Sequence, residues 1–159
     1  YIKDITGKEV KFYEFNILDE KKTEEVSERT EEVQELNMEG TTSWVNESFR
    51  TRIFPYSGEK ILEKKYTKWF DCDKINCELT VRTRRSGDYM AVSQSGGHKK
   101  LTRCMIDDKI PGELRGKLPL VVDGNEVLWI VGGRINERYK ITSETGRVLE
   151  ITYQGGNVQ

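Results

Sequence analysis

Residues 95–111 read SGGHKKLTRCMIDDKIP, and the rest of the chain is organised around this stretch. Two adjacent glycines precede His98, Lys99 and Lys100, and the apolar residues that follow recur at the spacing of one helical face. The pattern predicts a glycine loop that leads into a helix of about three turns. Because proline restricts the residue before it to extended geometry, we expect this helix to end near Lys109.

The start of the predicted helix has two interpretations. Unpaired backbone N–H groups at a helix N-terminus, glycines that permit close approach and neighbouring cations would together attract a phosphate. A solvated basic turn in an ordinary surface loop has the same composition, since glycine pairs and lysine pairs are common. The residues by themselves favour the ordinary loop.

The composition is that of a folded protein with one domain or two small ones. The chain has 159 residues, 35% hydrophobic and 33% charged, with a formal net charge of −1. Residues 1–60 carry 14 acidic and 9 basic side chains, whereas residues 61–159 carry 13 and 17. The second part is therefore the better candidate for binding an anionic partner. No apolar run approaches the length needed to span a membrane.

Three cysteines occur, at Cys72, Cys77 and Cys104, without a second pair of ligands that would complete a zinc site. We interpret them as reduced thiols of a cytoplasmic protein rather than as metal ligands or a disulfide. The chain begins at Tyr1, without an initiator methionine and almost directly in strand-like sequence. We therefore expect it to be a piece of a longer protein.

Residues 1–77 are expected to form a β-rich segment that contains an acidic helix. Residues 10–18 and 49–54 alternate between apolar and polar side chains, as half-buried strands do. Residues 19–39 hold 9 acidic and 3 basic side chains with a thin apolar stripe. This stretch is either an acidic helix or a mobile linker, and the stripe slightly favours the helix.

Residues 78–153 are expected to form a second unit of class α+β, a small mixed or antiparallel sheet with one or two helices. Strands are predicted at residues 79–85, 89–92, 120–123, 127–131, 139–142 and 147–153. Asp123-Gly124-Asn125 predicts a hairpin, and residues 113–117 add one helical turn. Alternation within the first strand places Arg82 and Arg84 on the same face. Residues 154–159 form a polar tail.

The chain shows no constellation typical of a self-contained enzyme. His98 is its only histidine and lies among lysines, so no base is placed to activate a nucleophile. Asp107 and Asp108 are adjacent, and adjacent side chains diverge on a helix. The residues around Gly96 and Gly97 lack the spacing and the hydroxyl of a Walker loop.

A set of cations spread over several predicted elements remains as the candidate site. Its members are Arg82, Arg84, Arg85, His98, Lys99, Lys100, Arg103, Lys109 and Arg134. If the fold gathers them, they form a surface that tracks phosphates, and if it scatters them, they are solubilising charges. At the predicted helix start, Lys99 and Lys100 should contribute more to anion binding than Arg138 and Lys140, which lie in a strand-like stretch.

Five short motifs follow one another in the second half of the chain. They are LTVRTRRSGD at 79–88, GGHKKL at 96–101, IDDKIP at 106–111, LPL at 118–120 and LWIVGGRI at 128–135. This ordered series closely resembles the C-terminal domain of bacterial tRNA(Ile)-lysidine synthases, from about residue 78 to Tyr153. Gly112 and Gly116 depart from the family, which more often has charged residues there. Residues 1–77 resemble the preceding segment only loosely.

The resemblance implies the noncatalytic, tRNA-binding part of an ATP-dependent ligase. That enzyme uses ATP and lysine to convert the wobble cytidine of tRNA(Ile) to lysidine. ATP and Mg belong to an N-terminal catalytic domain with a Ser-Gly-Gly-x-Asp-Ser loop, of which residues 94–98 share only Ser-Gly-Gly, so no cofactor is expected in this part. The implied partners are the catalytic domain and tRNA(Ile), gripped at its acceptor stem, and the nine basic residues named above are the candidate contacts.

A second hypothesis is an interdomain or homodimerisation module without direct RNA contact. In that case the acidic stretch and the β surface hold domains or subunits together, and the basic residues are incidental. Binding of tRNA and sedimentation of the chain distinguish the two hypotheses.

Overall fold

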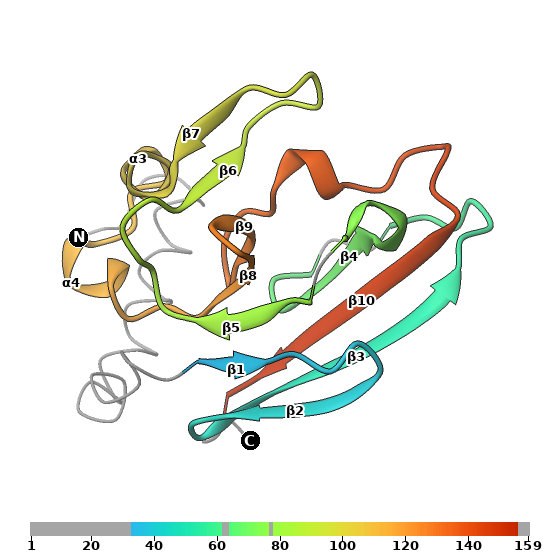
Figure 1. Cartoon of the computed structure of the whole chain (residues 1–159), viewed down its shortest axis with the longest axis horizontal. Helices are drawn as coiled ribbons and strands as arrows, with labels where there is room; N and C mark the ends of the chain where they lie inside the picture. Colours follow the sequence, from blue (N-terminus) through green and yellow to red (C-terminus); the bar gives the residue numbers. More distant parts are fainter. Residues whose placement is uncertain (1–32, 62–63, 77, 156–159) are drawn as a thin grey trace.

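The computed structural model describes residues 33–61, 64–76 and 78–155 (Figure 1). Their regular structure consists of two β-sheets, two short α-helices and two 3-10 helices, η2 (Cys72–Lys74) and η3 (Glu137–Tyr139). The first sheet has the spatial order β1 (Gln34–Glu35), β5 (Thr80–Arg82), β8 (Leu120–Asp123), β9 (Glu126–Ile130), β6 (Tyr89–Ala91) and β7 (His98–Lys100). The second has the order β2 (Gly40–Trp44), β3 (Glu47–Pro55), β10 (Arg147–Gln154) and β4 (Thr67–Asp71). Strands β6 and β9 are parallel, and the other named pairs are antiparallel. The predicted α+β class is confirmed.

Strand β10 lies at the centre of the second sheet. It pairs with β3 on one side and β4 on the other, and Figure 1 shows it running alongside β3. The predicted strands at residues 49–54 and 147–153 are thus confirmed. The strand predicted at residues 139–142 is wrong, because Glu137–Tyr139 form a short 3-10 helix. The Asn136 side chain caps this turn by accepting a hydrogen bond from the backbone N–H of Arg138.

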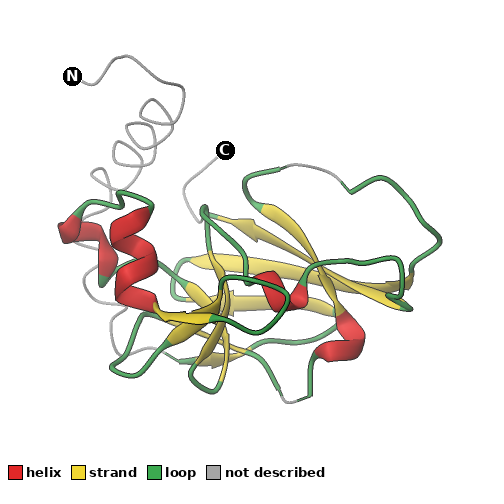
Figure 2. Cartoon of the chain, turned by 90° about the horizontal axis from the view of Figure 1, so that it is seen from above, coloured by secondary structure: helices red, strands yellow, loops and turns green. Residues whose placement is uncertain are grey.

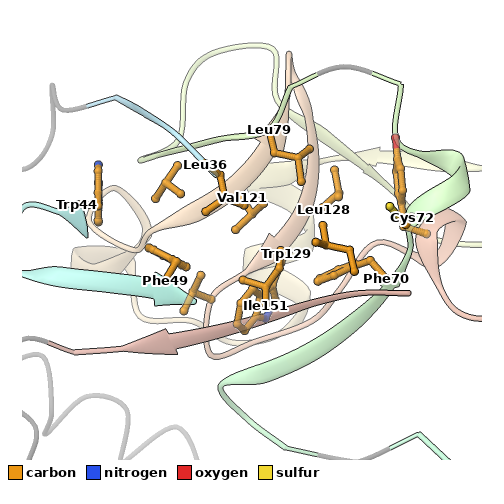
Figure 3. Packing of buried hydrophobic residues seen from close by; sticks show 14 residues of the cluster. Leu36, Trp44, Phe49, Phe70, Cys72, Leu79, Val121, Leu128, Trp129 and Ile151 are labelled. Atoms are coloured by element: carbon orange, nitrogen blue, oxygen red, sulfur yellow. The ribbon is translucent and has the colours of Figure 1, made fainter. Parts of the chain in front are cut away.

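The four-stranded sheet joins residues from both sides of the boundary predicted between residues 77 and 78. Strands β3 and β4 precede it, and β10 follows it. The buried cluster in Figure 3 is likewise shared. It includes Leu36, Phe49 and Phe70 from the first side and Val121, Trp129 and Ile151 from the second. The predicted boundary therefore runs through a common sheet and core.

The inner strands of the six-stranded sheet are covered on both faces. One face packs on the four-stranded sheet, and the other packs on α3 (Leu101–Asp107) and α4 (Gly112–Arg115), which lie close together in Figure 2. On β8, Val121 belongs to the first interface and Val122 to the second. A bulge in the pairing of β8 with β9 directs both Leu128 and Trp129 into the first interface. Two covered faces explain why residues 120–122 of β8 and 127–130 of β9 are apolar.

Several predictions for the N-terminal part lie outside the described residues. These are the strand at residues 10–18 and residues 19–32 of the acidic helix. Within the described end of that helix, Gln34 and Glu35 instead form β1, which pairs with β5, so the helix is wrong there. At the other end of the chain, Gln154 belongs to β10 rather than to the predicted tail, and residues 156–159 lie outside the described part.

Helix α3 buries the predicted apolar face, formed by Leu101, Cys104 and Met105, and ends at Asp107. The glycine pair does not lead into it directly. Residues 92–97 connect β6 to β7, and the three residues of β7 separate this loop from the helix. That part of the prediction is wrong because the backbone of residues 98–100 pairs with residues 89–91.

Val45 is a strained residue in the turn between β2 and β3. Its φ is 56°, and its side chain is exposed. A β-branched residue in the left-handed region costs roughly 1–2 kcal/mol, a cost that glycine avoids. We expect Val45→Gly to raise the free energy of unfolding by about 1 kcal/mol, measured by urea unfolding. A decrease would show that packing of the Val45 side chain outweighs the strain of its backbone.

Candidate functional site

Strand β7 forms an exposed basic edge of the six-stranded sheet. Among the described strands it pairs only with β6, and His98, Lys99 and Lys100 are all exposed. Lys99 lies on the helix side, where its Nζ donates to Asp107 Oδ2 at 2.7 Å. His98 lies on the opposite side, with its ring centroid 5.1 Å from that of Tyr89. Because side chains alternate along a strand, Lys100 shares the face of His98, so β7 presents basic side chains on both faces.

The glycine loop before β7 is a hairpin connection rather than a phosphate cradle. The N–H of Gly97 donates to Ser93 Oγ at 3.2 Å, and the N–H of Gly96 donates to the Ser93 carbonyl at 3.3 Å. At the start of α3, the N–H of Leu101 donates to the Asp88 carbonyl at 2.9 Å. These donors are used within the fold, which favours the ordinary-loop interpretation of the glycine pair.

Four predicted site residues gather around α3, and we name them the α3 basic cluster: Lys99, Arg103, Lys109 and Arg134. Lys99 and Arg103 both reach Asp107, at 2.7 and 3.5 Å. Arg134 donates two hydrogen bonds to Asp108, at 2.8 and 2.6 Å. Three of these cations contact the carboxylates of Asp107 and Asp108, and the fourth, Lys109, makes the charge of the cluster positive overall. The hydrogen bond from Lys99 lowers the pKa of Asp107 below its ordinary value, so the ion pair persists at neutral pH.

Arg82 is not part of this exposed surface. Its guanidinium is buried and donates two hydrogen bonds to Asp88, at 2.9 and 2.8 Å, and further bonds to the carbonyls of Thr83 and Gly124. We correct the prediction that Arg82 and Arg84 form one basic face, because Arg82 is enclosed between the residue 83–88 turn and the β8–β9 hairpin.

Arg84 and Arg85 follow β5 in this turn. Arg84 is half-buried, and its Nε lies 4.0 Å from the position that a Cβ would occupy on Gly116. Arg85 is exposed, and its backbone N–H donates to Asp88 Oδ2 at 2.7 Å. The buried pair of Arg82 and Asp88 therefore fixes the backbone from which the Arg85 side chain projects.

Sequence reasoning missed a polar network around Glu126. This buried carboxylate accepts hydrogen bonds from Arg138 at 2.7 Å, from the Tyr139 hydroxyl at 3.2 Å and from Asn136 Nδ2 at 3.2 Å. The hydrogen bond to Glu126 raises the pKa of Arg138. Arg138 therefore has a structural role, and no local pattern could reveal it because Glu126 lies on another element.

The two described cysteines lie in the buried cores of the protein. Cys72 and Cys104 are buried free thiols, and burial raises the pKa of both, which makes them poor nucleophiles.

Across residues 33–61, 64–76 and 78–155, no three His, Cys, Asp or Glu side chains are grouped so that they could hold a metal. No helix in the same ranges has the length and apolar character to cross a bilayer.

Comparison with known proteins gives one consistent result. Residues 79–151 match the family described as TilS substrate C-terminal domain. Similar curated proteins are the tRNA(Ile)-lysidine synthases of Caldanaerobacter subterraneus subsp. tengcongensis, 44% identical over 89 residues, and of Clostridium tetani, 43% identical over 90 residues. These matches cover 56% and 57% of this chain but 19% of each relative, so the chain spans about a fifth of their length.

A solved structure entitled "Crystal structure of TILS C-terminal domain" is also similar. It is 26% identical in sequence, with a TM-score of 0.63. The similarity covers 79% of this chain and 98% of that chain. The likeness therefore extends beyond residues 79–151.

Proposed function

We propose that this chain, whose residues 79–151 belong to the family of TilS substrate C-terminal domains, is the tRNA-binding part of a tRNA(Ile)-lysidine synthase. In this proposal the longer enzyme uses ATP and lysine to convert the wobble cytidine of tRNA(Ile) to lysidine. ATP and Mg²⁺ belong to a separate catalytic domain in this proposal, and the N–H groups of Gly96 and Gly97 are used within the hairpin by Ser93. The chain described here grips the tRNA at its acceptor stem.

The observation that carries the proposal is the position of β7 and the α3 basic cluster within the family-matched residues. A-form RNA hides its major groove from side chains, so proteins hold it through phosphates and 2′-hydroxyls. Exposed lysine and arginine side chains supply such contacts without reading the bases. We therefore expect binding to be led by the RNA backbone.

Replacement of both Lys99 and Lys100 by alanine should weaken tRNA(Ile) binding by roughly 1–3 kcal/mol, which is about 5- to 150-fold in Kd. The two side chains project from the exposed edge strand, and the ion pair that Lys99 forms with Asp107 contributes less than about 1 kcal/mol to folding. Filter binding at one fixed salt concentration measures the loss, and thermal melts should show a nearly unchanged Tm.

The matched control removes Arg50 and Lys60, two exposed cations outside the family-matched residues, and should leave Kd nearly unchanged. Arg138 and Lys140 are unsuitable as a control, because Arg138 holds the buried Glu126. Equal losses in both double variants would refute this placement of the RNA surface. Unaltered binding together with a dimer in sedimentation would favour the interdomain or dimerisation module.

A further inference from the structure

Lys109 has an unfavourable backbone conformation, and its side-chain charge forms no ion pair with another described residue. Among the described residues, only Val45 and Lys109 adopt a left-handed backbone without being glycine, and φ of Lys109 is 61°. The left-handed region is costly for residues with a Cβ, so glycine is the usual residue at such positions.

The backbone around Lys109 closes the C-terminus of α3. The N–H of Lys109 donates to the Ile106 carbonyl at 2.9 Å, and the N–H of Ile110 donates to the Met105 carbonyl at 3.0 Å. These two bonds form a Schellman motif, in which the left-handed residue is normally glycine. Ile110 and Met105 are both buried in the cluster beneath the helix, which completes the motif. The turn thus requires the left-handed backbone but not a lysine side chain.

The Lys109 charge has no counter-ion within the described part of the chain. Its side chain is exposed, and it forms no ion pair with another described residue. The adjacent Asp108 is already bound by Arg134, and Asp107 is bound by Lys99. A cation at a helix C-terminus interacts favourably with the helix dipole, and this is the competing structural explanation for a lysine here.

We propose that the Lys109 side chain binds a phosphate of RNA. Glycine at this position would make the fold more stable but could not bind the phosphate. This inference rests on the proposed tRNA-binding function. The partner it implies is the sugar-phosphate backbone of RNA, which the other members of the α3 basic cluster contact beside it. Lys109 supplies a charge that no carboxylate of the described chain neutralises.

Three single variants separate charge from backbone strain. Lys109→Gly removes both, and we expect Tm to rise by about 2–4 °C while affinity for tRNA(Ile) falls about fivefold. The slope of log affinity against log salt should also decrease by about 0.7–0.9. Lys109→Arg keeps the charge and the strain, so neither Tm nor affinity should change. Val45→Gly relieves similar strain without loss of charge, so it should raise Tm and leave affinity unchanged.

The measurements are thermal melts and filter binding of the 159-residue chain to tRNA(Ile) at several salt concentrations. A Lys109→Gly variant with unchanged affinity would overturn the inference and leave Lys109 as a partner of the helix dipole. Equal losses in Lys109→Gly and Lys109→Arg would also overturn it, because charge would not be the cause. If Lys109→Gly is less stable than the wild type, Lys109→Asn provides a second neutral residue that tolerates the left-handed backbone. If the Lys99 and Lys100 double variant also binds tRNA(Ile) with unchanged affinity, the proposed function fails. If the double variant loses affinity while Lys109→Gly binds as the wild type does, only the inference about Lys109 is refuted.

Discussion

Asp88→Ala should lower the free energy of unfolding by about 3–5 kcal/mol, because it leaves the buried guanidinium of Arg82 without its counter-ion. The side chains of Arg82 and Asp88 are only 3% and 1% exposed. Asp88 also accepts hydrogen bonds from the Arg85 backbone and from Asn125, and both would be lost. Urea unfolding followed by circular dichroism measures the loss.

Two further variants test the cause of this loss. Glu137→Ala removes an exposed ion pair with Lys140 and should cost less than about 1 kcal/mol. Replacing both members of the buried pair, as Arg82→Met with Asp88→Leu, should recover part of the stability lost in Asp88→Ala. A loss below about 1 kcal/mol in Asp88→Ala would show that water reaches Arg82 and that the pair does not hold the turn.

The same pair makes stability depend on pH. Burial by itself would raise the pKa of Asp88, but hydrogen bonds from Arg82, Arg85 and Asn125 outweigh it and hold this pKa below the ordinary value of 3.8. A carboxyl group with a depressed pKa stabilises the fold above its unfolded pKa, and this contribution is lost as pH falls through the folded pKa. The wild type should therefore lose stability more steeply below about pH 4 than Asp88→Ala does.

Affinity for tRNA(Ile) should fall about 50-fold when salt is raised from about 50 to 200 mM, given on the order of three to five phosphate contacts. Each contact releases condensed counter-ions from the RNA, so the free energy of binding depends on the logarithm of the salt concentration. The exposed cations of β7 and the α3 basic cluster are numerous enough to supply these contacts.

Filter binding across this range measures the slope, and potassium glutamate in place of chloride controls for anion binding to the protein. A Kd that does not change with salt would contradict backbone-led binding and favour the interdomain module. A slope that is steep for tRNA(Ile) and for unrelated duplex RNA alike would agree with recognition of phosphates rather than bases.

Local sequence was sufficient for the elements whose partners are near in the chain. Asp123-Gly124-Asn125 joins β8 and β9 as predicted, because the turn residues and the two apolar runs specify a hairpin by themselves. The apolar spacing of Leu101, Cys104 and Met105 likewise specified α3. The ordered motifs of residues 79–135 also indicated the family that residues 79–151 match.

Tertiary structure decided which strands pair and which cations are exposed. The partners of β10 lie about 80 to 100 residues earlier in the chain, and no local pattern encodes such distant pairing. Alternation placed Arg82 opposite Val81, but β5 lies inside the sheet, where Arg82 is buried against Asp88, whereas Lys99 lies on the edge strand β7 and remains exposed. Sequence by itself determined that the chain carries these cations. Only the packing of the layers determined which of them can contact a phosphate, because the exposure of a side chain depends on contacts between elements that are distant in sequence.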